Sequence, residues 1–88
     1  MNFTIGWDVI SFDQMALIVR THPEHRALLA DALQELTRCL RTAPVETGES
    51  REGDDRVGFF GPLVVAFRVF PADKRVQVAK VRLRWLLL

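Results

Sequence analysis

The spacing of apolar residues changes once along this 88-residue chain, and that change limits the fold more than any other feature. Four leucines recur at helical spacing, with charged residues on the other side, at Leu29, Leu33, Leu36 and Leu40. From residue 56 onward, apolar residues instead alternate with polar ones or form short runs. The first pattern predicts an amphipathic helix and the second predicts strands. We therefore expect an α+β fold in which a helical part precedes most of a sheet.

The start of the chain predicts one strand and a short helix. Residues 2–9 alternate apolar side chains with smaller or polar ones, which is the period of a half-buried strand. Ser11 and Gln14 have the spacing of a capping box, in which the two side chains satisfy free backbone groups at a helix start. This pattern predicts a short helix from near Phe12.

The leucine-rich helix has its own start and stop signals. Thr21 and Glu24 repeat the capping-box spacing, and Pro23 fits a first helical turn because its missing N–H has no partner there. We expect this second helix to end before Pro44.

Three strands are predicted in the second half of the chain, at residues 56–60, 63–70 and 75–85. Turn residues separate them, with Gly61-Pro62 after the first and Pro71–Lys74 after the second. Such short connections favour an antiparallel meander. The middle strand is nearly apolar on both faces, so we expect it to be central, with the helices packed on one face of the sheet.

The last strand changes phase near its middle. Apolar residues stand at even positions up to Val78 and at odd positions from Ala79 onward, which a bulge near Ala79 or Lys80 would explain. Beyond the bulge, one face is expected to carry Lys80, Arg82 and Arg84.

These cations belong to the most basic part of the chain. Residues 56–88 hold seven bases and one acid (net +6), residues 45–55 one base and five acids (net −4), and residues 1–44 four bases and five acids (net −1). Alternate residues of a strand lie about 6 to 7 Å apart, an interval that suits the phosphates of RNA. The alternative is a solvated sheet face whose Lys and Arg residues block edge pairing.

Several classes of protein are excluded by what the sequence lacks. The length predicts a single domain over residues 1–88. We expect a cytoplasmic protein, since Cys39 has no partner for an internal disulfide and the first residues do not read as a secretion signal. No apolar run is long enough for a membrane helix. Motifs for nucleotide hydrolysis or zinc are absent, so we expect no cofactor, no metal and no small-molecule substrate.

The order of elements, together with residues 31–81, resembles the RelE/ParE superfamily of type II toxin-antitoxin toxins. In that superfamily a helix ends at a proline, a loop with glycine follows, and a strand opens with an arginine, here Arg56. A strand of the form G-P-L-x-V-x-F-x-V and a final basic strand complete the sheet. The stretch Gly48-Glu49-Ser50-Arg51 is similar to a motif of a subgroup of small RelE/ParE-like proteins.

The resemblance implies a toxin that a cognate antitoxin neutralises. Its target would be mRNA on the ribosome, cut by a ribosome-dependent mRNA interferase, or DNA gyrase, inhibited without chemistry. A third possibility is an inactive toxin fold retained as an antitoxin-binding module. Cleavage by RelE-type toxins uses basic residues and commonly a tyrosine near the C-terminus. This chain has no tyrosine.

The resemblance also implies which residues carry the site. The central-strand arginine of RelE-type toxins falls here at or near Val64. The basic character is best kept by Arg56, Arg82 and Arg84, which are the candidate catalytic residues. The candidate RNA-binding residues are Arg51, Lys80, Arg82 and Arg84. Lys80 is a possible proton carrier, and only if it is buried.

The chain ends in four large apolar residues, Trp85, Leu86, Leu87 and Leu88. They are expected either to pack on the helices or to form a docking patch for another chain, such as an acidic antitoxin segment that folds on binding.

Three other features are interpreted as structural. Gly48 with Ser50 predicts a turn, so the motif that contains them marks a hinge first. His22 and His25 lack further ligands and are expected to be solvated helix residues. Cys39, at the border of the apolar helix side, is expected to act as a small hydrophobic residue.

Overall fold

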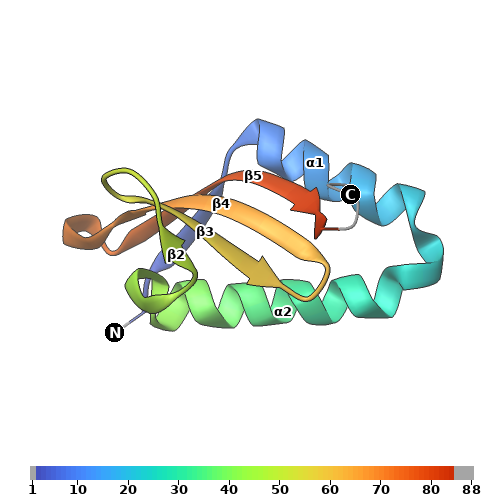
Figure 1. Ribbon diagram of the computed structural model, residues 1–88, viewed down its shortest axis with the longest axis horizontal. Coiled ribbons are helices and arrows are strands. Elements are labelled where there is room, and N and C mark those ends of the chain that lie inside the picture. Colours follow the sequence, from blue (N-terminus) through green and yellow to red (C-terminus); the bar gives the residue numbers. More distant parts are fainter. Residues whose placement is uncertain (1, 85–88) are drawn as a thin grey trace.

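A computed structural model describes residues 2–84 as an α+β fold (Figure 1). The chain forms a first strand, β1 (Thr4–Trp7), then two helices, α1 (Val9–Thr21) and α2 (Arg26–Thr42). Four strands follow: β2 (Glu49–Ser50), β3 (Asp55–Phe60), β4 (Leu63–Phe70) and β5 (Arg75–Leu83). This order confirms the predicted fold class. In the described part of the chain, no helix is long and apolar enough to cross a membrane.

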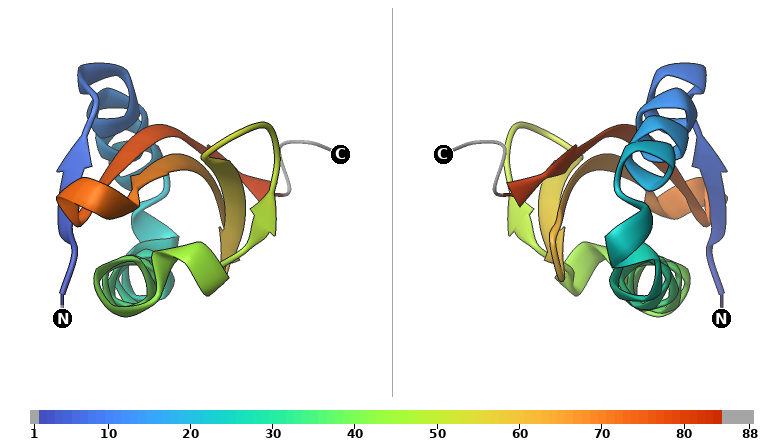
Figure 2. Two further views of the ribbon diagram at one scale, coloured as in Figure 1. Left: turned by 90° about the vertical axis from the view of Figure 1, so that its left-hand side faces the viewer. Right: turned by 90° about the vertical axis from the view of Figure 1, so that its right-hand side faces the viewer.

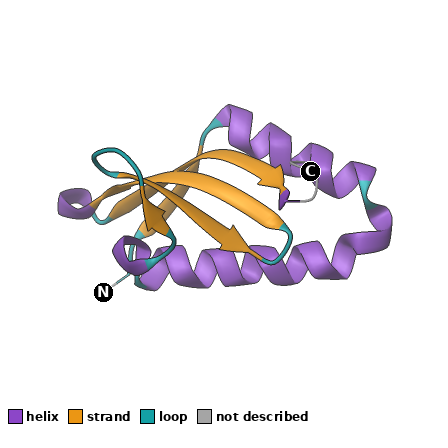
Figure 3. Ribbon diagram, viewed as in Figure 1, coloured by secondary structure: helices purple, strands orange, loops and turns teal. Residues whose placement is uncertain are grey.

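The strands form one five-stranded sheet in the order β1-β5-β4-β3-β2 (Figure 3). Strand β4 pairs antiparallel with both β3 and β5, which confirms the meander, and β4 is the central strand as expected. Strand β1 pairs parallel with β5 at the opposite edge from β2. The sequence did not predict β2, which pairs only Glu49 with Val57 and Ser50 with Arg56.

The core lies between the helices and one face of the sheet. Figure 2 shows the sheet arching around α2. Every second residue of β4, from Leu63 to Val69, is buried and stands opposite a buried residue of β5. The helices add their apolar sides to this layer with Met15, Ile18, Leu29, Ala32, Leu36 and Leu40. The other sheet face carries no helix, and we call it the open face.

The start of α1 corrects the predicted capping box. The helix begins at Val9, with Asp8 as its N-cap, so Ser11 lies inside the helix. The Oγ of Ser11 is 2.8 Å from the carbonyl oxygens of Asp8 and Val78. Gln14 accepts a hydrogen bond of 2.7 Å from the backbone N–H of Val81. The two side chains bind the edge of β5 beyond the end of β1 instead of capping their own helix.

The start of the second helix also differs from the prediction. Thr21 ends α1, where its hydroxyl donates to the carbonyl oxygen of Leu17, and it caps nothing. A 3-10 turn at Pro23–His25 leads into α2, so the proline does stand in a first helical turn. The end of α2 at Thr42, before Pro44, agrees with the prediction.

The bulge in the last strand is confirmed. Ala66 pairs with Lys80 and Phe67 pairs with Val78, so Ala79 is the extra residue of β5. Because of the bulge, Val81 points to the same face of the sheet as Val78, although one is odd-numbered and the other even-numbered. Apolar residues therefore face the helices both before and after Ala79.

Candidate nucleic-acid interface

The open face combines an apolar centre with a cationic margin. The register places Phe59 of β3, Val64 of β4 and Arg82 of β5 side by side on this face. One step along the strands, Val57, Ala66 and Lys80 form a second such row. The cations therefore lie on β5, and the apolar side chains lie on β4 and β3, which follow β5 in the sheet.

Lys80, Arg82 and Arg84 form a row of exposed cations, which we call the basic row. The residues between them, Val81 and Leu83, are fully buried. No carboxylate of residues 2–84 forms a salt bridge with any of the three. The predicted sharing of one face by these cations is confirmed as geometry, while their binding to RNA stays a prediction.

Arg84 is fixed at the end of the row by two contacts. Its backbone N–H donates a hydrogen bond of 2.7 Å to the carbonyl oxygen of Pro62, in the turn between β3 and β4. Its guanidinium lies 5.1 Å from the centroid of the Phe59 ring. A cation over an exposed aromatic ring gains about 0.5–1 kcal/mol. The contacts hold a positive charge above the open face.

Arg68 is a further cation of the open face, and the sequence analysis missed it. It stands on the central strand opposite Asp55, and the two side chains form a bidentate pair with distances of 2.6 and 3.1 Å. The hydrogen bonds from Arg68 lower the pKa of Asp55, and those to Asp55 raise the pKa of Arg68. Counting outward from the Gly61-Pro62 turn would have paired these positions. Their charges offset each other.

Arg56 is separated from the basic row. It stands opposite buried Phe67, hence on the helix side of the sheet. Its Nε donates to the carbonyl oxygen of Thr47 at 2.8 Å, and its Nη2 donates to that of Gly48 at 3.1 Å. The structure thus gives Arg56 the position of a clamp on the loop before β2, away from the other two candidate catalytic residues.

The motif of residues 48–51 forms the turn into β2. Gly48 has a φ of +68°, and Glu49 and Ser50 are the two residues of the strand. Arg51 follows, with its Nη1 3.5 Å from a carboxylate oxygen of Glu49. Arg51 also lines a hollow of about 480 Å³, together with Asp55, Arg56 and Arg68. The geometry agrees with the structural interpretation of this motif.

The other candidate residues lie away from the open face. His22 and His25 flank the junction of α1 and α2, with ring centroids 6.4 Å apart. Nδ1 of His22 is 3.0 Å from the carbonyl oxygen of Ile18. Across residues 2–84, no cluster of three His, Cys, Asp or Glu side chains could hold a metal ion.

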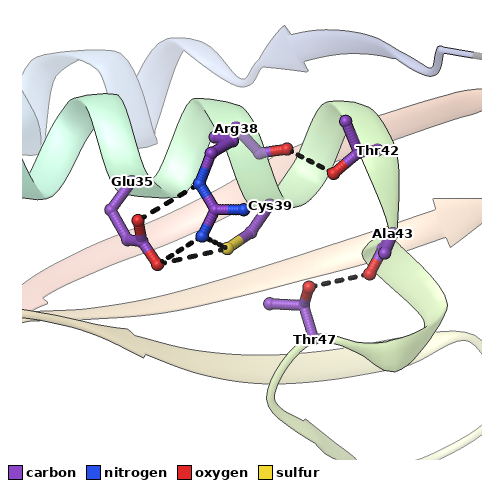
Figure 4. Close-up of polar contacts among 6 residues, drawn as sticks. All are labelled: Glu35, Arg38, Cys39, Thr42, Ala43 and Thr47. Carbon is purple, nitrogen blue, oxygen red and sulfur yellow. Dashed lines mark hydrogen bonds and ion pairs between the residues drawn. The ribbon is translucent and has the colours of Figure 1, made fainter.

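Cys39 lies on α2 beside Glu35 and Arg38 (Figure 4). The thiol Sγ is 3.5 Å from the Oε1 of Glu35, which also receives a 2.8 Å hydrogen bond from Arg38. Burial raises the pKa of the Cys39 thiol, and the Glu35 carboxylate raises it further. Cys39 also packs against the core, which confirms its expected place at the border of the apolar side.

The chain end that the sequence analysis assigned to a partner lies outside the described residues. This applies to Trp85, Leu86, Leu87 and Leu88. The docking role of these four residues stays a prediction.

Comparison with known proteins shows the fold. Neither a protein-family model nor a curated protein sequence matches this chain. Among solved structures, it is similar to a chain of the chromosomal ParDE TA system from P. aeruginosa, with a TM-score of 0.73 and 17% identity. That match covers 92% of this chain and 95% of the other.

A second similar structure is a chain of the toxin-antitoxin complex RelBE2 from Mycobacterium tuberculosis. Its TM-score is 0.71 at 15% identity, and the match covers 96% of this chain and 93% of that chain. The chain has the RelE/ParE fold. The fold predicted from the resemblance is therefore confirmed.

The open face offers charge and apolar surface but few groups for proton transfer. Arginine stabilises a developing phosphoryl charge well and is a poor general base. Lys80 is exposed, so the burial that its role as a proton carrier required is absent. The carboxylate of Asp55 is held by Arg68. These side chains are suited to binding a polyanion and stabilising charge on it.

Proposed function

We propose that this chain is the toxin of a type II toxin-antitoxin system and that it acts on translation. The observation that carries this proposal is the fold similarity, which extends over nearly the whole of both matched chains. The basic row on the open face adds independent support, because three cations that have no acidic partner among residues 2–84 attract polyanions.

The proposed activity is that of a ribosome-dependent mRNA interferase. The ribose 2′-OH attacks the neighbouring phosphorus, the bond to the 5′-oxygen breaks, and a cyclic phosphate remains on the upstream RNA. Arg82 and Arg84 would stabilise the charge that develops on the phosphoryl oxygens, while Lys80 and Arg51 would hold the flanking phosphates. The proton of the 2′-OH would pass to water or to a group of the ribosome, because residues 2–84 offer no suitable base on the open face. The departing 5′-oxygen would take a proton from water.

A translating extract tests this activity directly. Purified protein is added, and message ends are mapped by primer extension. We expect cuts at ribosome-bound codons, and a loss of cutting for Arg82→Gln and Arg84→Gln. Arg26→Gln is the matched control, since it removes an exposed arginine from the start of α2 on the helix side. Intact message in an extract with active ribosomes would rule out the interferase.

A second candidate function is inhibition of DNA gyrase without chemistry. The observation that favours it is the lack of catalytic groups, since the chain has no tyrosine and Val64 occupies the central strand of the open face. A supercoiling assay separates the two candidates. Inhibition by this chain together with uncut message supports gyrase, and unchanged supercoiling at high protein excess excludes it.

A protein partner is supported by apolar surface on the helices. A groove of about 520 Å³ between α1 and α2 is lined by Trp7, Phe12, Val19 and Leu33. Phe12 is 63% exposed, and Ile10 on the same helix is 66% exposed. We propose that a cognate antitoxin covers this surface. Co-expression with the neighbouring reading frame should restore growth, and normal growth without that frame would indicate an inactive module.

A further inference from the structure

Phe59 is an aromatic residue that stays exposed among residues 2–84. It stands on the open face of β3 and is 48% exposed, whereas Phe60 beside it is buried in the core. Its cross-strand neighbour Val64 is half-buried and leaves a flat apolar surface next to the ring. A large exposed ring within a sheet contributes little to folding, so its surroundings are informative about a ligand.

The surroundings of Phe59 are cationic on one side only. Arg84 holds its guanidinium 5.1 Å from the ring centroid, and its backbone is anchored to the turn at Pro62. Arg82 stands two strands away in the same cross-strand row, about 10 Å from Phe59 at the usual strand spacing. An aromatic ring beside a line of cations is the arrangement with which proteins bind single-stranded nucleic acids, because bases stack on the ring and phosphates follow the cations.

The same face contains a second aromatic ring under an arginine, and it serves as a comparison. Phe70 is half-buried at the far end of β4, with the guanidinium of Arg75 4.1 Å from its centroid. Arg75 is half-buried too, and it donates a hydrogen bond to the side chain of Gln77. That pair is packed into the end of the sheet, whereas Phe59 and Arg84 remain exposed.

We propose that Phe59 and Arg84 form a stacking site for one base of a single-stranded nucleic acid whose backbone runs along Arg82 and Lys80. The base packs on the exposed ring and on the planar guanidinium, and its phosphate meets the cations of β5. The proposal takes its ligand class from the proposed function, and it adds the residue that selects single strands over duplexes. A duplex keeps its base faces stacked inside, so it can use the basic row and not the ring.

Fluorescence anisotropy with a labelled oligouridine of about 12 nucleotides tests the stacking site. We expect Phe59→Leu to weaken binding about tenfold. Its salt dependence should not change between about 50 and 200 mM, because no charge is removed. Phe70→Leu should leave the affinity within about twofold of the wild type. Arg82→Gln should instead lower the salt slope by about 0.7, the value for one phosphate contact with a single strand.

Two further measurements separate stacking from a structural role. Phe59→Trp keeps a ring, so it should restore the affinity, and its added indole emission should be quenched when the oligouridine binds. A duplex RNA of the same length should bind wild type and Phe59→Leu equally. Thermal melting of each variant controls for folding.

Three outcomes would overturn the stacking site. One is equal binding of the oligouridine by wild type and Phe59→Leu, which would leave the interferase proposal intact. Another is a wild-type protein that arrests growth and cuts message but does not bind the single-stranded oligouridine. A third is binding of an acidic peptide, such as polyglutamate, in place of RNA, which would assign the open face to a protein partner. Failure of the proposed function would show in different assays, as uncut message in the translating extract and unchanged supercoiling by gyrase.

Discussion

Gly48 should be the least replaceable residue of the loop that joins α2 to the sheet. Its φ of +68° lies in the left-handed region, where a side chain costs about 1–2 kcal/mol. A Cβ at this position would lie 2.1 Å from the carbonyl oxygen of Val57 and 2.8 Å from the Cα of Gly58. Both atoms belong to the backbone of β3, so no side-chain rotation can relieve the contact.

The loop must therefore move if Gly48 gains a methyl group. The movement would break the pairing of β2 with β3 and the two hydrogen bonds that Arg56 donates to the loop. With about 1 kcal/mol for each hydrogen bond and the cost of the left-handed conformation, Gly48→Ala should destabilise the fold by about 3 kcal/mol. For a domain of this size, that loss lowers the melting temperature by roughly 15 °C.

Gly53 provides the matched control. It also has a positive φ, of +59°, but no atom of the described residues other than Gly53 and its two chain neighbours lies within 4 Å of the position that its Cβ would take. The left-handed conformation opposes Gly53→Ala, while the lower flexibility of the unfolded chain offsets part of that cost. The net loss of stability should be about 1 kcal/mol. Chemical denaturation of both variants measures the difference. Equal losses of unfolding free energy would refute the steric argument for Gly48.

Single contacts lead to four further predictions. Arg68 lowers the pKa of Asp55, so the pair should stabilise the fold at pH values above the usual aspartate pKa. This stabilisation should be lost as the pH falls through the lowered pKa of Asp55. The melting temperature of Asp55→Asn should lack this dependence on acid pH. The same variant frees Arg68, which should tighten oligouridine binding and raise the salt slope by about 0.7. Gln14→Ala should cost about 1–2 kcal/mol and speed hydrogen exchange at the Val81 amide, which loses its acceptor. Arg56→Lys should destabilise the fold by about 1 kcal/mol, which lowers the melting temperature by a few degrees, because lysine cannot replace both hydrogen bonds of the guanidinium. Weaker RNA binding at an unchanged melting temperature would instead show that Arg56 belongs to the RNA-binding surface.

Strands β3, β4 and β5 were predictable because their signals are local. Residues between Gly61-Pro62 and Pro71 form a nearly continuous apolar run that defines β4, and the turns on both sides fix its partners. The change of phase at Ala79 located the bulge, since a one-residue shift moves every later side chain to the other face. The basic row was predicted from the alternation of charged and apolar residues in the last strand after Ala79.

The helix starts were not predictable from spacing alone. Ser11 and Gln14 fit a capping box, but each side chain instead binds β5, at Val78 and Val81, more than sixty residues away in sequence. Such partners become visible only after the sheet has formed. Arg56 was misleading in a similar way, because its guanidinium satisfies two loop carbonyls whose position depends on the turn at Gly48.

The net charge of each segment also does not reveal which cations are paired with acidic groups in the folded chain. In the folded chain Arg68 is paired with Asp55 and Arg56 is bound to the loop, while the basic row has no acidic partner among the residues that the structure describes. Asp55 pairs with Arg68, four residues along β4 from the position opposite Arg82, which is about 13 Å. At physiological ionic strength the screening length is about 8 Å, so this carboxylate barely reduces the potential at Arg82. Within residues 2–84, the open face is thus mixed in charge at the end near Asp55 and carries only cations at the end near Phe59. A polyanion should bind at the cationic end.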